Sequence, residues 1–157
     1  MDRKDEKFIT TRKSFGKYIS VIYKNQNYYI GKYIEKYNLN RTEYKYLIQI
    51  YENEGICQDD IVNILKVDKY EVAKGVKSLI KKGYVYKEKD EIDKRKNRLY
   101  ITELGNEIKS GVIEILKKTS EILTKGFKEE EKNLAFEFLL KMAENMGDEV
   151  SKIKGNK

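Results

Sequence analysis

Two short helical segments of the sequence are followed directly by two β-prone segments, and this order limits the folds that the chain can adopt. The first helix is predicted to start at Gln58 or Asp59, and the second is predicted to start after Asp68. A turn of about three residues between two helices is typical of a helix-turn-helix. The second helix is expected to end at Lys82-Gly83, because glycine readily adopts the left-handed conformation that stops a helix.

The segments after this second helix predict a β-hairpin. Tyr84-Val85-Tyr86 and Leu99-Tyr100-Ile101 are rich in residues that favour strands, and the polar stretch between them can form the turn. A helix-turn-helix followed at once by a two-stranded hairpin is a winged helix, in which the hairpin is the wing. We therefore predict a mainly α-helical chain with a small β-hairpin wing.

Long apolar stripes at helical spacing flank this small unit on both sides. The sequence predicts one unit over residues 1–157, with an N-terminal helix over 8–38, a winged helix-turn-helix over 39–102 and C-terminal helices over 103–153. Its most regular N-terminal stripe covers residues 15–37. The winged helix-turn-helix, here called the reader, is too small to cover these stripes. We therefore predict that the flanking helices form a homodimer, which is the commonest way to bury such faces.

Composition favours a binding protein over an enzyme. The 157 residues carry a net charge of +7, which favours an anionic partner, and they include no histidine. The lack of histidine excludes Ser-His-Asp and Cys-His catalytic systems and imidazole metal ligands. Adjacent carboxylates such as Glu129-Glu130 lie at a predicted exposed helix start without a nucleophile. We expect no enzymatic activity, no cofactor and no metal.

The single cysteine, Cys57, allows no internal disulfide and no multi-cysteine zinc site. We interpret it as a small buried apolar residue, with redox sensing as the alternative. No apolar stretch is long enough to span a membrane, and the N-terminus lacks the apolar core of a signal peptide. We therefore expect a cytoplasmic protein without a membrane partner.

The stretch over residues 90–105, DEIDKRKNRLYITELG, carries the most specific motif. It combines Asp93-Lys94-Arg95, an apolar strand and Thr102-Glu103-Leu104-Gly105. These residues resemble the Asp-x-Arg wing tip and the Leu-Thr-x-x-Gly motif of the MarR family of bacterial transcriptional regulators, with Ile101 in the place of the leucine. Residues 65–85 and 127–131 are also similar to the family, so the resemblance spans nearly the whole chain.

This resemblance implies a sequence-specific regulator of double-stranded DNA, most simply a homodimeric repressor that a small aromatic or anionic effector releases. The second helix of the helix-turn-helix would enter the major groove, and Arg95 of the wing would enter the minor groove, with Asp93 holding its guanidinium. A dimer would face a pseudo-palindromic operator. Lys94, Lys96 and Arg98 would contact phosphates. The full set of residues expected at the DNA is Lys69, Tyr70, Lys74, Lys77, Asp93, Lys94, Arg95, Lys96 and Arg98.

Two positions of the predicted recognition helix need separate comment. Glu71 is either the partner of Asp68 in a capping box, which we favour, or an acceptor from cytosine N4 in the major groove. Gly75 stands where the family prefers a larger apolar residue, and glycine costs about 1 kcal/mol of helix propensity relative to alanine.

An effector crevice between the dimer helices and the reader is a further expectation of the resemblance. Its candidate residues are Phe15, Tyr18, Ile22, Tyr44, Leu47 and Tyr51, although an aromatic stripe at helical spacing more often belongs to the core. The alternative for the whole protein is a winged helix that binds RNA or protein without reading an operator. RNA recognition relies on exposed aromatic side chains, and the outer face of the recognition helix offers only Tyr70.

Overall fold

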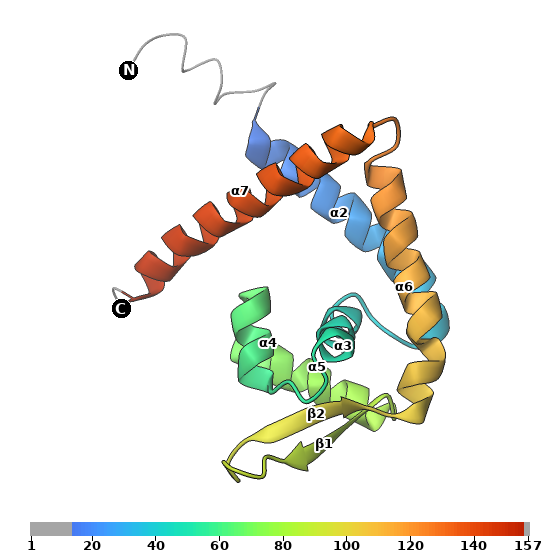
Figure 1. Ribbon diagram of the computed structural model, residues 1–157, viewed down its shortest axis with the longest axis vertical. Coiled ribbons are helices and arrows are strands. Elements are labelled where there is room, and N and C mark those ends of the chain that lie inside the picture. Colours follow the sequence, from blue (N-terminus) through green and yellow to red (C-terminus); the bar gives the residue numbers. More distant parts are fainter. Residues whose placement is uncertain (1–13, 156–157) are drawn as a thin grey trace.

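The computed structural model describes residues 14–155 and contains the predicted order of helices and strands (Figure 1). The elements are α2 (Phe15–Ile34), the 3-10 helix η1 (Glu35–Tyr37), α3 (Glu43–Glu52), α4 (Gln58–Leu65), α5 (Lys69–Lys81), β1 (Val85–Lys89), β2 (Asn97–Ile101), α6 (Glu103–Leu123) and α7 (Glu129–Gly155). The mainly α-helical fold with a hairpin wing is confirmed. Residues 8–13 of the predicted N-terminal helix lie outside the described part of the chain.

The helix-turn-helix consists of α4 and α5, and the turn between them covers residues 66–68. Lys66 ends α4 in the left-handed conformation, at φ 53°, and Asp68 caps α5 by accepting a hydrogen bond from the Tyr70 N–H at 2.7 Å. At the other end of the reader, α2 gives way to η1, and Asn38 then adopts a left-handed φ of 53°. The predicted helix over 15–37 is therefore correct, with its last turn tightened to a 3-10 helix.

The wing is an antiparallel hairpin in which Val85 pairs with Ile101 and Lys89 pairs with Asn97. The inner strand, β2, is also attached to the segment between α3 and α4. The Gly55 N–H donates to the Leu99 carbonyl at 2.9 Å, and the Leu99 N–H donates to the Ile56 carbonyl at 3.0 Å. These two bonds extend the hairpin by a short third segment, so the wing has a fixed base on the helix-turn-helix.

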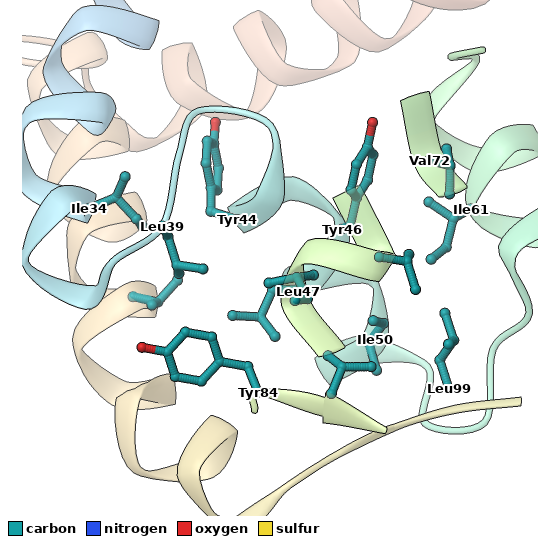
Figure 2. Close-up of a cluster of buried hydrophobic side chains, with 14 of the residues drawn as sticks. Ile34, Leu39, Tyr44, Tyr46, Leu47, Ile50, Ile61, Val72, Tyr84 and Leu99 are labelled. Atoms are coloured by element: carbon teal, nitrogen blue, oxygen red, sulfur yellow. The ribbon is translucent and has the colours of Figure 1, made fainter. Parts of the chain in front are cut away.

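One apolar core joins the reader to the end of the N-terminal helix. Figure 2 shows Leu47 of α3 between Leu39 and Tyr84 on one side and Ile50 and Leu99 on the other. The α5 side chains that pack into this core are fully buried, namely Val72, Val76 and Leu79. Burial of each large aliphatic side chain contributes about 1.5–3 kcal/mol, so this face determines which side of α5 remains exposed.

The long helices extend from this core as an arm (Figure 1). The helix α2 packs against α6, and α7 turns back beyond the end of α6 without a buried residue. No helix within residues 14–155 is long and apolar enough to cross a membrane.

Candidate nucleic-acid interface

The exposed face of α5 carries the four predicted major-groove residues. Lys69, Tyr70, Lys74 and Lys77 are all exposed, opposite the buried Val72, Val76 and Leu79. The ammonium groups of Lys74 and Lys77 have no partner among the described residues. The Tyr70 ring is 77% exposed at the first turn of the helix. This is the end of a recognition helix that contacts base edges in a helix-turn-helix.

Lys69 differs from the other three residues because it is already paired. Its Nζ lies 2.8 Å from a carboxylate oxygen of Asp59 on α4, and both side chains are exposed. The hydrogen bond to Asp59 raises the pKa of Lys69. An exposed pair of this kind contributes little to stability, so an anionic partner can displace Asp59 easily.

The capping box predicted at Asp68 and Glu71 does not form. Asp68 caps the helix through the Tyr70 N–H, but Glu71 makes no hydrogen bond back to Asp68 within the described structure. The Glu71 side chain therefore remains exposed on the recognition helix. A complete capping box occurs one helix earlier, where Asp60 accepts from the Cys57 N–H at 3.2 Å.

The wing tip holds Arg95 outward through Asp93. A single carboxylate oxygen, Asp93 Oδ1, accepts from Arg95 Nε at 3.1 Å and from the Arg95 N–H at 3.2 Å. The Arg95 side chain is 92% exposed, and its two terminal nitrogens make no other hydrogen bond within residues 14–155. Asp93 thus fixes the root of the guanidinium and leaves its outer edge available. Lys94 and Lys96 are exposed on either side.

Asp90 organises the loop that presents this tip. Its Oδ1 accepts from the backbone N–H groups of Asp93 and Ile92, at 2.7 and 2.9 Å, and its Oδ2 accepts from Arg98 Nε. The backbone hydrogen bond from Asp93, followed by the side-chain hydrogen bond from Arg98, lowers the pKa of Asp90 to about 2. The carboxylate is therefore ionised at neutral pH and holds the loop in shape.

Arg98 lies at the base of the wing, and its guanidinium has intramolecular partners. Besides Asp90, it donates from a terminal nitrogen to the Gly55 carbonyl at 3.1 Å. The predicted phosphate contact assigned to Arg98 therefore competes with a structural role that joins the wing to the α3–α4 segment. Sequence reasoning missed this role because nothing in the motif indicates which acceptor lies beside Arg98 in space.

The six predicted effector residues are not gathered into one cavity. Phe15, Tyr18 and Ile22 are exposed on the first half of α2, whereas Leu47 is fully buried in the core. Tyr51 is half-buried, and its hydroxyl donates to the Gly105 carbonyl. Burial raises the pKa of Tyr44, and the neighbouring Tyr23 adds to the rise.

Two surface hollows lie elsewhere on the molecule. One, of about 440 Å³, borders residues 53–64 and Arg98, and the other, of about 400 Å³, borders the α6–α7 turn. None of the six predicted effector residues lines either hollow.

Cys57 is buried, as predicted, and is not set up as a reactive thiol. Its Sγ donates to Asp60 at 2.9 Å. Burial raises the pKa of the Cys57 thiol, and the Asp60 carboxylate raises it further. A reactive cysteine needs the opposite environment, one that stabilises the thiolate.

The sequence interpretation also missed a buried ion pair behind the recognition helix. Lys82, just after α5, lies 2.7 Å from Glu43 at the start of α3, and the Glu43 side chain is almost completely buried. The position of Glu43, but not that of Lys82, could have been found from the sequence. Asn40-x-x-Glu43 has the spacing of a capping box, and Asn40 Oδ1 accepts from the Glu43 N–H while Glu43 accepts from the Asn40 N–H.

Comparison with known proteins agrees with this geometry. Residues 39–96 match the model of the MarR family. The chain is 32% identical over 121 residues to the HTH-type transcriptional regulator YybA of Bacillus subtilis (strain 168), an alignment that covers 76% of this chain and 81% of YybA.

Solved structures extend the comparison to most of the chain. A MarR transcriptional regulator from Methanosarcina mazei Go1 is 33% identical, with a TM-score of 0.77 over 83% of this chain and 94% of that one. A MarR family regulator from Listeria monocytogenes, solved in complex with a 26mer DNA, is 29% identical, with a TM-score of 0.86 over 91% of this chain and 95% of that one. The chain therefore belongs to the MarR family of winged-helix transcriptional regulators.

Proposed function

We propose that the protein is a homodimeric repressor that binds a specific double-stranded DNA operator, with α5 in the major groove and Arg95 in the minor groove. The observation that carries this proposal is the wing tip. Asp93 fixes Arg95 at its root, while the side chain is 92% exposed and its terminal nitrogens make no hydrogen bond to any residue over 14–155. Narrow A·T-rich minor grooves concentrate negative potential and attract such a side chain.

The chemistry of α5 supports reading of the major groove. Lysine can donate to guanine O6 and N7 or to phosphates, and tyrosine can donate to a phosphate or pack against a thymine methyl. Lys74 and Lys77 are exposed one turn apart on the same face, and Tyr70 lies at the first turn. Glu71, free of a capping partner, is available to accept from cytosine N4.

The basic residues around the wing add a salt-dependent contribution. Lys94 and Lys96 flank Arg95 and are exposed. Each phosphate that a cation neutralises releases counterions, so the affinity should fall steeply as salt concentration rises. Arg98 contributes mainly by holding the wing on the helix-turn-helix.

The arm helices support a homodimer. The helix α7 has 27 residues and none is buried, although its apolar residues form a broad stripe that includes Leu134, Phe138, Leu139 and Met146. The first half of α2 likewise exposes Phe15, Tyr18, Ile19 and Ile22. A monomer rarely exposes contiguous apolar patches of this size, and a second copy is the simplest cover.

The effector site of the proposal lies where α3 meets the long helices. Tyr44 lies near Tyr23 of α2, and the Tyr51 hydroxyl donates to the Gly105 carbonyl of α6. Lys45 lies 5.4 Å from the Tyr23 ring centroid, which places a cation beside that ring. Closure of the dimer around this region would create the crevice that a small aromatic or anionic molecule needs. Leu47 and the exposed Phe15 are weaker candidates than Tyr44.

Selection of bound duplexes from a random DNA pool tests this function. We expect enrichment of a palindromic sequence with half-sites about one helical turn apart and A·T-rich flanks. Competition by RNA of the same length at equal salt separates this proposal from an RNA-binding winged helix. Enrichment of no duplex, or displacement by RNA as readily as by the selected DNA, would count against operator binding.

A further inference from the structure

We infer that the Glu43–Lys82 ion pair fixes the angle between the recognition helix and the N-terminal arm, and thereby sets the half-site spacing that a dimer accepts. This inference rests on the proposed function, because spacing has meaning only for a dimer that binds two half-sites. Lys82 and Glu43 are positioning residues, since neither lies on the exposed face of α5.

One ammonium group connects three elements at this junction. Lys82 Nζ donates to Glu43 Oε2 at 2.7 Å, to Glu43 Oε1 at 2.9 Å and to the Asn38 carbonyl at 2.6 Å. Lys82 follows the last residue of α5, and Glu43 begins α3. Asn38 follows η1, at the end of the N-terminal arm, which consists of α2 and η1. The group therefore ties the carboxyl end of the recognition helix directly to the end of the arm.

Further hydrogen bonds hold the Glu43 carboxylate in one orientation. Its Oε1 accepts from the Ser78 hydroxyl of α5, and its Oε2 accepts from the Asn40 N–H at 2.8 Å. The residue is 1% exposed. Burial opposes its ionisation, but the hydrogen bonds from Lys82, Ser78 and the Asn40 backbone outweigh that effect and lower the pKa of Glu43.

An ion pair with a buried carboxylate often adds little net stability compared with apolar side chains of the same shape, so its effect on geometry is the more informative property. The apolar face of α5 packs through Val72, Val76 and Leu79. Hydrophobic attraction is not directional, and the packing of side-chain ridges into grooves sets the angle between two helices only as a tendency. Hydrogen bonds at one end of the helix supply the missing directional constraint.

The lever arm makes a small tilt significant. The helix α5 has 13 residues, and the junction lies at its carboxyl end while Lys69 and Tyr70 lie at its amino end. At 1.5 Å per residue the helix is about 20 Å long, so a tilt of about 10° moves the reading end by about 3 Å. That displacement is about one base-pair step of B-DNA, which is 3.4 Å. Two tilted readers in a dimer would therefore tolerate, or prefer, a different spacing.

The test compares spacing preference with half-site affinity. Glu43→Gln and Lys82→Met each remove one charge of the pair, and Glu52→Gln is the matched control, because Glu52 is an exposed carboxylate on the same helix. Each protein is titrated against duplexes that carry two copies of the selected half-site, with the spacing changed by one or two base pairs in either direction. A duplex with one half-site provides the reference.

The wild-type protein and Glu52→Gln should discriminate against a one-base-pair change in spacing by about tenfold, comparable to the cost of a mismatched base pair. Both junction variants should reduce that ratio to about threefold or shift the preferred spacing, while the affinity for one half-site changes by less than about twofold. Lys82→Arg, which keeps a donor for the carboxylate, should retain the wild-type profile.

Circular dichroism identifies any variant that fails to fold, in which case the remaining junction variant decides. A wild-type spacing profile in a folded junction variant would overturn the inference. An equal loss of affinity at every spacing, including the single half-site, would also overturn it, because the pair would then act on the reader itself. Failure of the wild-type protein to select any duplex would instead overturn the proposed function.

Discussion

Gly75 lies directly against the ring of Tyr46, so that α5 approaches α3 more closely than any residue with a side chain would allow. A Cβ placed at Gly75 would lie 2.3 Å from Tyr46 Cε2 and 2.5 Å from Tyr46 Cδ2. The Tyr46 ring is 1% exposed and cannot move into solvent without opening the core. The glycine that departs from the family pattern is therefore matched to the tyrosine that fills the space.

We predict that Gly75→Ala destabilises the protein in spite of its better helix propensity. Alanine gains about 1 kcal/mol in a helix, whereas overpacking a core costs about 1–3 kcal/mol, and the contact here is with a buried ring. The net loss should reach up to about 2 kcal/mol in urea denaturation. Tyr46→Leu removes the ring. The free energy of unfolding of the double variant should therefore be higher than the value expected when the losses of the two single variants are added. Simple additivity would show that the two residues do not interact.

Helix starts illustrate what the sequence could and could not predict. The positions of α4 and α5 were predictable because an apolar period marks both helices, and Gly83 marks the end of α5. The prediction of a capping box at Asp68 and Glu71 was wrong. Asn40 and Glu43 have the same spacing, and they do form the two reciprocal hydrogen bonds of a capping box. Local spacing does not decide between them, because Glu43 is held by Lys82, which is 39 residues away in sequence.

The wing shows the same division between local and distant information. Asp93 and Arg95 are two residues apart in sequence, so their contact was predictable from the motif, and the structure contains it. Arg98 also donates to the Gly55 carbonyl, 43 residues away in sequence, and only the folded chain brings these two residues together. The six effector candidates do not line one cavity within a single copy of residues 14–155. Helical periodicity predicts which face of a helix is apolar, but it does not predict which element covers that face.

Arg95→Ala should weaken binding to A·T-flanked operators and leave the fold unchanged. The side chain is 92% exposed, and its one partner within residues 14–155 is Asp93, so its removal exposes no core. We expect a loss of about 1–3 kcal/mol in binding free energy in a gel-shift titration, with a smaller loss when the flanks are G·C-rich. Lys94→Ala is the control for general charge loss, because it should weaken both types of operator equally. Unchanged operator affinity would remove Arg95 from the interface.

Phe138→Glu should convert the protein to a monomer. Phe138 is exposed on the apolar stripe of α7, and a buried unpaired carboxylate is far more costly at an interface than in water. Light scattering after size exclusion should show half the molecular mass of the wild-type protein, and operator affinity should fall by at least about tenfold, because two half-sites no longer bind together. Glu144→Lys on the same helix is the control. A wild-type mass for Phe138→Glu would place the dimer interface elsewhere.

Asp90 should make the wing sensitive to acid within a narrow pH range. Its pKa is about 2 in the folded protein, against an ordinary value of 3.8. Because the folded-state pKa is the lower one, the ionised carboxylate stabilises the folded protein above about pH 4, and that contribution is lost as the pH falls toward about 2. Asp90→Asn cannot ionise, so it should be less stable than the wild type at neutral pH, and the difference should shrink between pH 4 and pH 2. Denaturant titrations at several pH values measure the difference, and comparing the two proteins removes the contribution of other carboxylates such as Glu43. A difference that stays constant over this range would mean that Asp90 does not hold the wing through its charge.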